Sequence, residues 1–410
     1  MGLFYTFILS IGVFAYKVLG IFQLKASQRV NGAKQSLKIA AQKPSENPRI
    51  WIHCASLGEF EQAIPILETL RKEKPETRLI LSFFSPSGYN QQKDNPLVDE
   101  VYYLPWDFYR DQKKFITAIQ PSCCLLVKYE FWPRLIQVLV EKNIPVISIS
   151  SRFFDNQIYF KSWGKWFLSR LGEVDHFFVQ DENSKQLLAT KGIDQVSIVG
   201  DTRMDRVTQL LTTTHASPKI DALHTKAYVV LGSSWPEDEI LFWSLIERFP
   251  QWTWVVAPHD ISEKRLESIQ QKSGLNWHRW SRLQAEQIND VSFILVDSIG
   301  ELKHLYAAAQ WAYVGGGMGT KGLHNILEAG VYGIPVLIGK NYNRFQEAVD
   351  LIAAKGVFSV KDSSSLEQLL VEFSKNPEFR RETGIINKEF IRKNEGASAL
   401  ILEYLQKHYA

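Results

Sequence analysis

Short apolar runs recur along this chain, and stretches with helical periodicity separate them. After the first run, for example, Phe60, Ala63, Ile64, Leu67 and Leu70 repeat at the spacing of an amphipathic helix. Strands that alternate with helices predict an α/β fold with a parallel sheet in each half of the chain. The predicted strands are Arg49–Cys54, Leu79–Ser82, Cys124–Val127, Pro145–Ser150, His176–Val179 and Val196–Val199 in the first half, and Tyr228–Leu231, Trp252–Ala257, Phe293–Val296, Trp311–Val314 and Val336–Gly339 in the second. Helices are predicted to finish the chain, from Leu366 to Tyr409.

The stretch from Leu3 to Phe22 differs from these runs because it is apolar almost throughout, with one interruption at Lys17. About 20 apolar residues suffice to cross a membrane. A cleaved signal peptide fits poorly, since no basic segment precedes the stretch and no small-x-small cleavage site follows it. Four basic residues follow and favour a cytoplasmic location for the rest of the chain, namely Lys25, Arg29, Lys34 and Lys38. We predict a membrane anchor, which either spans the bilayer or lies in its interface because Lys17 can reach the interface in both cases.

Length and composition set the domain organisation. The chain has 410 residues and a net charge of +3, so no large positive field argues for a nucleic-acid partner. We predict an anchor and basic linker at 1–43, a first Rossmann-like domain at 44–211, a second at 219–385, and a C-terminal helix at 386–410 that would pack back on the first domain. Polar linkers are predicted at 44–48 and 212–218.

The three cysteines show no metal-ligand spacing. Cys123 and Cys124 are adjacent within a predicted strand, and no motif that would supply a base surrounds Cys54. We therefore predict that Cys123 and Cys124 are reduced core residues of a cytosolic protein, and a catalytic role for Cys54 has no support in the sequence.

The strongest chemical pattern runs from Gly315 to Ala348. Five glycines, at 315, 316, 317, 319 and 322, would let backbone N–H groups approach a ligand closely. A helix predicted to begin near His324 would direct its N-terminal N–H groups at that loop and so bind a phosphate. Asn325 and Glu328, three residues apart, would share the first turn of this helix, with the amide near the phosphate and the carboxylate near ribose hydroxyls. A glycine-rich turn in an ordinary α/β domain is the alternative, and the Asn/Glu pair favours the nucleotide site.

Two acidic residues follow predicted strands in the first half. Glu59 ends the loop after the first strand, and Glu130 follows the third strand. Open α/β sheets place their chemistry at the carboxyl ends of strands, so two acids at one sheet edge predict a working pair. Either acid alone would be interpreted as a carboxylate at the N-terminus of a helix, where its charge interacts favourably with the helix dipole.

Aromatic and basic residues are mixed between Arg152 and Arg170. This composition suits a surface that faces lipid headgroups. It is equally compatible with a helix whose rings make core contacts. The candidates for contact with membrane or acceptor are Lys161, Trp163, Lys165 and Trp166, together with Ser56 and Gly58 in the loop before Glu59.

Five blocks, in order along the chain, resemble the Kdo transferases. These are GT-B glycosyltransferases with two Rossmann-like domains whose parallel sheets face a central cleft, and they move 3-deoxy-D-manno-octulosonic acid (Kdo) from CMP-Kdo to a lipid A precursor. The matching blocks are Ala55–Glu59, Ser85–Gly88, Tyr129–Pro133, Asp297–Leu302 and Gly322–Glu328. The resemblance implies an inverting transfer at the cytoplasmic face of the inner membrane, in lipopolysaccharide core biosynthesis. It implies neither a metal nor a cofactor beyond the donor substrate.

The resemblance also implies roles for individual residues. Glu59 matches the catalytic base and Glu130 a second essential acid, because the acceptor hydroxyl must lose a proton as it attacks the anomeric carbon. Asn325 and Glu328 match nucleotide contacts. The donor-binding candidates are Arg203, Ser234, Pro258, His259, Ile299, Gly300, Glu301, Gly322, Asn325 and Glu328, with Ile299 and Gly300 where the cytosine is held and Arg203 as a cation for the phosphate or the Kdo carboxylate.

Three positions depart from the family pattern. His259 follows Pro258 where the family usually has arginine, Leu323 stands where a second glycine is usual, and Asp201 and Arg203 replace the usual asparagine and lysine around Thr202. The phosphate cation would then be His259, Arg203 or Lys321. Two other functions stay open, namely a GT-B transferase or epimerase that uses a UDP-sugar, and a non-catalytic membrane-associated nucleotide sensor. The paired acids speak against the sensor.

Overall fold

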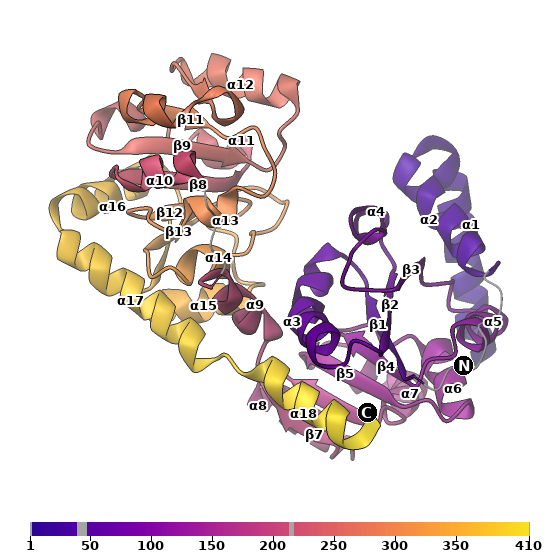
Figure 1. Ribbon diagram of the computed structural model, residues 1–410. Helices are drawn as coiled ribbons and strands as arrows, with labels where there is room; N and C mark the ends of the chain where they lie inside the picture. Colours follow the sequence, from indigo (N-terminus) through magenta and orange to yellow (C-terminus); the bar gives the residue numbers. More distant parts are fainter. Residues whose placement is uncertain (1, 39–46, 213–216, 410) are drawn as a thin grey trace. The chain divides into compact units, whose positions relative to one another are not determined.

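The computed structural model describes residues 2–38, 47–212 and 217–409, and the chain divides into two compact units (Figure 1). Unit 1 comprises Met1–Arg206 and Glu395–Ala410, and unit 2 comprises Val207–Asn394. Each unit contains a seven-stranded sheet, and every strand pairing in both sheets is parallel. The predicted α/β fold with a parallel sheet in each half is confirmed. Most of the first predicted linker and residues 213–216 of the second lie outside the described residues.

The sheet of unit 1 has the strand order β3-β2-β1-β4-β5-β6-β7. Its side chains alternate between two cores, with Ile50 and Ile52 of β1 in one and Trp51 in the other. Both faces are covered, which explains the nearly continuous apolar runs. The order reverses between β1 and β4, the place where open α/β sheets bind ligands. The strands are β1 Arg49–Cys54, β2 Arg78–Phe83, β3 Glu100–Tyr103, β4 Cys123–Val127, β5 Val146–Ser151, β6 His176–Val179 and β7 Val196–Ile198.

Helices cover both faces of this sheet (Figure 1). The C-terminal helix α18 (Ala397–Tyr409) packs beside α3 and buries Ile401 and Leu405 in the same core as Ile50. The other helices of unit 1 are α1 Gly2–Phe22, α2 Leu24–Ser36, α3 Leu57–Glu73, α4 Pro86–Gln92, α5 Tyr109–Ile119, α6 Pro133–Glu141, α7 Lys165–Leu171 and α8 Glu182–Ala189, and α9 Thr202–Leu210 contains the boundary between the units.

Asp205 of α9 caps the start of α18. Its carboxylate accepts hydrogen bonds from the backbone N–H of Gly396 (2.5 Å) and of Ser398 (2.7 Å), and from the Ser398 hydroxyl (2.6 Å). The first N–H groups of a helix have no partner within the helix, and a carboxylate there satisfies them and complements the dipole. This contact therefore holds the terminal helix on unit 1.

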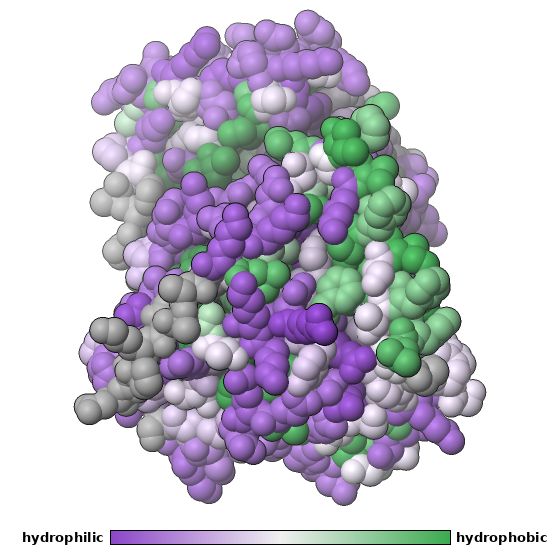
Figure 2. All heavy atoms as spheres, turned by 90° about the vertical axis from the view of Figure 1, so that its right-hand side faces the viewer, coloured by the Kyte–Doolittle hydropathy of each residue, from purple (hydrophilic) through white to green (hydrophobic). Residues whose placement is uncertain are grey.

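The helix α1 lies along unit 1 with one side against it. The Tyr5 hydroxyl donates to Asp107 (2.7 Å), and the Tyr16 ring lies 5.5 Å from that of Trp106. Apolar side chains on the other side are exposed, and hydrophobic residues form a band on the face of the molecule that carries α1 (Figure 2). The most exposed of them are Leu3, Phe4, Phe7, Phe14, Ile21 and Phe22.

Arg29 of α2 is one of the four basic residues that follow the predicted anchor, and its side chain is fully buried. The guanidinium lies 4.2 Å from the ring centroid of Phe84 and 4.1 Å from that of Trp106. Burial lowers its pKa to about 10, so it stays charged at neutral pH. The residue therefore fastens α2 to unit 1 through cation–π contacts.

The sheet of unit 2 has the strand order β10-β11-β9-β8-β12-β13-β14, and β8 and β12 are neighbours at its centre. Its core contains the buried rings of Trp252, Trp254 and Trp311. The strands are β8 Tyr228–Ser234, β9 Thr253–Pro258, β10 His278–Arg279, β11 Phe293–Leu295, β12 Ala312–Val314, β13 Val336–Ile338 and β14 Val357–Ser359. The helices are α10 Pro218–His224, α11 Pro236–Glu239, α12 Glu263–Ser273, α13 Leu302–Leu305, α14 Leu327–Gly330, α15 Gln346–Ala353, α16 Ser363–Lys375 and α17 Pro377–Lys393.

Two local expectations in unit 2 are wrong. The helix predicted to begin near His324 is α14, which begins at Leu327 and has four residues. Asn325 therefore precedes the helix, and a helix this short supplies no extended dipole to the loop. The strand predicted to end at Leu231 is β8, which continues to Ser234 beyond a shift in its register with β9.

Removal of the Asp205 cap tests how α18 is held. We expect Asp205→Ala to lower the free energy of unfolding by about 1–2 kcal/mol, because N–H groups at the start of α18 lose their acceptor. Urea unfolding of the full chain measures the change. Asp94→Ala is the control, since the Asp94 side chain is 87% exposed. Equal stability of the two variants would show that the cap contributes nothing.

Candidate functional site

Glu59 and Glu130 lie at the same edge of the unit 1 sheet. Strands β1 and β4 are paired neighbours, and Glu59 follows β1 in the first turn of α3, while Glu130 lies between β4 and α6. Both acids are near the Cys54 thiol. Burial raises the pKa of that thiol well above its usual value, and the charges of Glu59 and Glu130 raise it further. The structure thus brings the two predicted acids together at the switch point of the sheet.

The two carboxylates have different surroundings. The Glu130 side chain is 14% exposed, and its Oε2 accepts from the indole N–H of Trp132 (2.7 Å) and lies 3.1 Å from Nε2 of the buried His53. Glu59 is half-buried and accepts from the hydroxyl of Ser56, the residue that precedes α3. Gly58 beside it is exposed. Glu130 is therefore held by ring N–H groups, whereas Glu59 has the less constrained carboxylate and is better suited to take up a proton.

Arg203 is already engaged by a carboxylate of its own unit. Its guanidinium lies 2.8 Å from Asp201, and Gln62 also donates to Asp201 (2.8 Å). Burial alone would raise the pKa of Asp201, but the charge and hydrogen bonds of Arg203 lower it below its usual value. The cation predicted for the donor is thus part of an internal ion pair.

The aromatic and basic segment after β5 divides between core and surface. Tyr159 and Phe160 pack against the core of unit 1. Lys161, Trp163 and Lys165 are exposed. Trp166 is half-buried, with its ring centroid 5.3 Å from that of Tyr5 in α1. The core interpretation is therefore confirmed for Tyr159 and Phe160, and contact of the exposed residues with lipid stays a prediction.

The glycine-rich loop of unit 2 surrounds a carboxylate of the protein itself. The fully buried Asp238 of α11 accepts from the backbone N–H groups of Gly316 (2.8 Å) and Met318 (3.2 Å) and from the Tyr313 hydroxyl (2.8 Å). Gly316 has a φ of +91°, and an added Cβ would lie 2.0 Å from the Gly322 carbonyl oxygen, so only glycine fits. Two N–H groups that the glycine pattern assigned to a ligand are therefore used to fold the loop.

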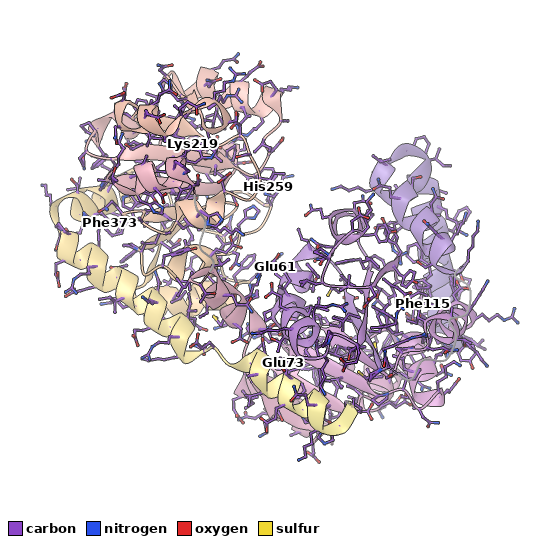
Figure 3. The ribbon with its side chains drawn as sticks, viewed as in Figure 1. Glu61, Glu73, Phe115, Lys219, His259 and Phe373 are labelled. Atoms are coloured by element: carbon purple, nitrogen blue, oxygen red, sulfur yellow. The ribbon has the colours of Figure 1, made fainter. Side chains whose placement is uncertain are left out.

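Three stacked rings lie at the carboxyl edge of the same sheet. His259 follows β9 at the margin of unit 2 (Figure 3), and its ring centroid lies 4.7 Å from those of both Trp235 and His324. The Trp235 indole donates to Nε2 of His324 (3.1 Å), and Nζ of Lys321 lies 5.3 Å from the Trp235 ring centroid. His259 and Lys321 are exposed, so both present a nitrogen to solvent at this edge.

Other residues that were predicted to bind the donor substrate also lie at this edge. Asn325 donates to Glu328 (3.2 Å) and accepts from the Leu327 N–H (3.2 Å), so the pair is in contact although Asn325 lies outside the helix. Ile299 is 89% exposed, and Gly300 beside it has a φ of +93°. Pro258 ends β9, Glu301 precedes α13 and is half-buried, Gly322 is half-buried, and Ser234 ends β8 and donates to Glu239 (2.7 Å).

Sequence reasoning missed several residues of both edges. His53 is a polar residue inside an apolar strand run, and that interruption was the available signal. No sequence motif marks Asp238, Glu239 or Arg265. The two acids lie in α11, a helix of only four residues. Arg265 pairs with Glu239 and is 12% exposed, so it does not replace the missing family arginine as an open cation. Within the described ranges, no group of three or more His, Cys, Asp or Glu residues is placed to hold a metal ion.

Comparisons with known proteins show which family this chain resembles. The family described as 3-deoxy-D-manno-octulosonic-acid transferase (kdotransferase) matches residues 27–206, which lie within unit 1. The chain is 28% identical to a 3-deoxy-D-manno-octulosonic acid transferase of Haemophilus influenzae, over 88% of this chain and 87% of the relative, and 26% identical to one of Chlamydophila psittaci, over 82% and 80%.

Solved structures show the same fold at low identity. A UDP-GlcNAc 2-epimerase from Neisseria meningitidis, bound to UDP-GlcNAc, has a TM-score of 0.62 at 16% identity and covers 88% of this chain and 100% of its own. A UDP-GlcNAc 2-epimerase from Methanocaldococcus jannaschii has a TM-score of 0.54 at 15% identity, with 84% and 99% covered. At these identities the likeness concerns the fold alone.

The half-buried His324 makes stability depend on pH. Burial, and then the neighbouring His259, lower its pKa from 6.5 to about 4. Between these values the unfolded chain binds a proton that the folded chain lacks, so stability falls as the pH drops across this window. We expect His324→Asn to lose less stability than the parent chain between pH 7 and pH 5, as urea unfolding measures. Equal losses in the two proteins would contradict this account of His324.

Proposed function

We infer the reaction from one premise: this chain belongs to the 3-deoxy-D-manno-octulosonic-acid (Kdo) transferases and is a glycosyltransferase of lipopolysaccharide core biosynthesis. We propose that it moves Kdo from CMP-Kdo to a lipid A precursor. One structural observation supports the proposal in addition to the family: Glu59 and Glu130 lie together at the carboxyl edge of β1 and β4, inside the matched segment.

The proposed step is a single displacement at the anomeric carbon of Kdo. The acceptor hydroxyl oxygen forms the new bond to that carbon, and the bond from the carbon to the phosphate oxygen of CMP breaks. The hydroxyl proton passes to the Glu59 carboxylate, and CMP leaves with the electron pair of the broken bond. Glu59 suits this role because its carboxylate is half-buried and accepts one described hydrogen bond, from the hydroxyl of Ser56.

The donor nucleotide is proposed to bind at the carboxyl edge of the unit 2 sheet. Negative charge grows on the leaving phosphate, which needs a cation or N–H donors. The exposed Lys321 and His259 are better supported for this role than Arg203, which is paired with Asp201. Asn325 and Glu328 would contact the nucleotide, and the exposed Ile299 would meet the base. We propose no role for a metal ion.

The transfer assay tests the function and the base together. We expect purified chain, CMP-Kdo and a lipid A precursor to give a Kdo-bearing product by mass spectrometry, in buffer containing EDTA. Glu59→Gln should lower kcat roughly 10²–10⁴-fold, since an amide takes up no proton. It should keep the protection that CMP gives against thermal unfolding.

The control is Glu61→Gln, which changes an acid two residues further along the same helix (Glu61 is labelled in Figure 3). Glu61 forms an ion pair with Arg206. This variant should keep the parental rate. Absence of product from the folded parent chain would overturn the proposed function. Full turnover by Glu59→Gln would overturn only the assignment of the base.

We propose further that the enzyme works at the cytoplasmic face of the inner membrane, with α1 lying in the interface rather than spanning the bilayer. Within the described ranges α1 is the helix that is long and apolar enough to cross, which is weak support by itself. Tyr5 and Tyr16 of α1 both contact unit 1, eleven residues or about 16 Å of helix apart. A helix docked along a globular unit over that length presents its apolar side, not its ends, to lipid.

Spin labels at Phe4, Ile11 and Phe22 test this orientation. These exposed positions occupy the start, middle and end of α1. On anionic vesicles we expect all three labels at a similar depth, about 5–10 Å below the headgroups. The control is a label at the exposed Lys361 of unit 2, which should stay in water. A label at Ile11 near the bilayer centre, with both ends at the headgroups, would show a spanning helix instead.

A further inference from the structure

A buried histidine stands behind Glu130. His53 is the fifth residue of β1, its side chain is fully buried, and its Nε2 lies 3.1 Å from Oε2 of Glu130. No step of the proposed reaction uses His53. A fully buried imidazole that contacts a carboxylate at the reacting edge of a sheet calls for a specific role, because burying a polar ring is costly unless its nitrogens are satisfied.

The other side of the imidazole is supported by two residues inside the sheet. His53 Nδ1 lies 2.9 Å from the Ser82 hydroxyl and 3.1 Å from the Ser82 carbonyl oxygen. His53 and Ser82 are register partners on β1 and β2. The indole N–H of Trp51 donates to the same hydroxyl (2.8 Å). The chain Trp51, Ser82, His53 and Glu130 therefore leads from inside the sheet to its carboxyl edge.

Two arrangements of the protons along this chain let Nε2 of His53 donate to Glu130. Trp51 can only donate, so it occupies one lone pair of the Ser82 oxygen and leaves the hydroxyl hydrogen free to bond to Nδ1. Nε2 of His53 then carries its hydrogen and donates it to Glu130. If Nδ1 instead donates to the Ser82 carbonyl and the ring is protonated, Nε2 again donates. In both states Oε2 of Glu130 accepts two N–H groups, from His53 and Trp132, and the two together fix the position of this oxygen.

We propose that His53 is a positioning residue that holds the Glu130 carboxylate in place through Oε2, so that Oε1 stays available to a hydroxyl of the donor sugar or the acceptor. Among the described residues no hydrogen bond engages Oε1. The proposal rests on the transfer reaction proposed above. The contacts among Trp51, Ser82 and His53 support this role, because partners behind a reacting group fix its orientation.

Two amide substitutions separate the two sides of the ring. The amide nitrogen of His53→Gln reaches about as far as Nε2 and can still donate to Glu130, whereas that of His53→Asn reaches only as far as Nδ1 and the Ser82 side. We expect His53→Asn to lower kcat roughly 10–100-fold, the usual cost of losing such a partner. The KM for CMP-Kdo should change less than about twofold, because the donor nucleotide binds elsewhere. His53→Gln should stay within about threefold of the parent.

A double-mutant cycle shows whether the effect passes through Glu130. In a Glu130→Gln background, which is slow by itself, His53→Asn should cause no further loss of kcat, because contacting residues are not additive. A full additional loss there, or parental kcat in His53→Asn alone, would overturn the role of His53. If the parent chain makes no product at all, the proposed function fails and His53 is not at issue.

A measurement on the parent chain covers the case in which His53→Asn does not fold. Histidine labelled with ¹⁵N reports the protonation of each ring nitrogen by NMR. At pH 7.5 we expect Nε2 of His53 to carry a hydrogen, with His53→Gln used to assign the signal. An Nε2 without a hydrogen cannot donate to Glu130, which would contradict the proposal.

Discussion

The structure depends on one constraint: a parallel sheet buried on both faces leaves only its strand ends for chemistry. Side chains within the strands have no water to satisfy them, so polar groups are confined to the carboxyl edge or must be hydrogen-bonded inside. In unit 1 the edge carries Glu59 and Glu130 where the strand order reverses. The polar residues His53 and Ser82 lie inside, and their mutual hydrogen bond satisfies them while extending toward Glu130.

Unit 2 meets the same constraint with a carboxylate of its own. A loop rich in glycine exposes backbone N–H groups, and without an acceptor these would cost free energy on burial. Asp238 supplies the acceptor for Gly316 and Met318. Two N–H groups of the loop are thus engaged within the protein itself, and the exposed side chains of Lys321 and His259 lie at the same edge. The nucleotide contacts proposed above therefore rely on these side chains as well as on the loop backbone.

Sequence reasoning was most accurate where apolar runs are long, since β1 and β6 have the predicted bounds. It failed where tertiary contacts decide. A helix was predicted to begin near His324, but this residue lies in the loop and stacks on His259, and the helix begins at Leu327. Strands β3, β10 and β14 are short and partly exposed, so no apolar run marks them. Nothing in the sequence indicates that Arg29 is buried, and only the folded chain shows the rings of Phe84 and Trp106 around it.

The central claim is that Glu59 removes the acceptor proton in one displacement at the anomeric carbon. A single displacement reverses the configuration of that carbon, whereas two successive displacements restore it. The anomeric configuration of Kdo in the product, determined by NMR and compared with that in CMP-Kdo, is therefore the most direct measurement. The account predicts inversion. Retention of the donor configuration would contradict it, because a nucleophile rather than a base would then be required at this edge.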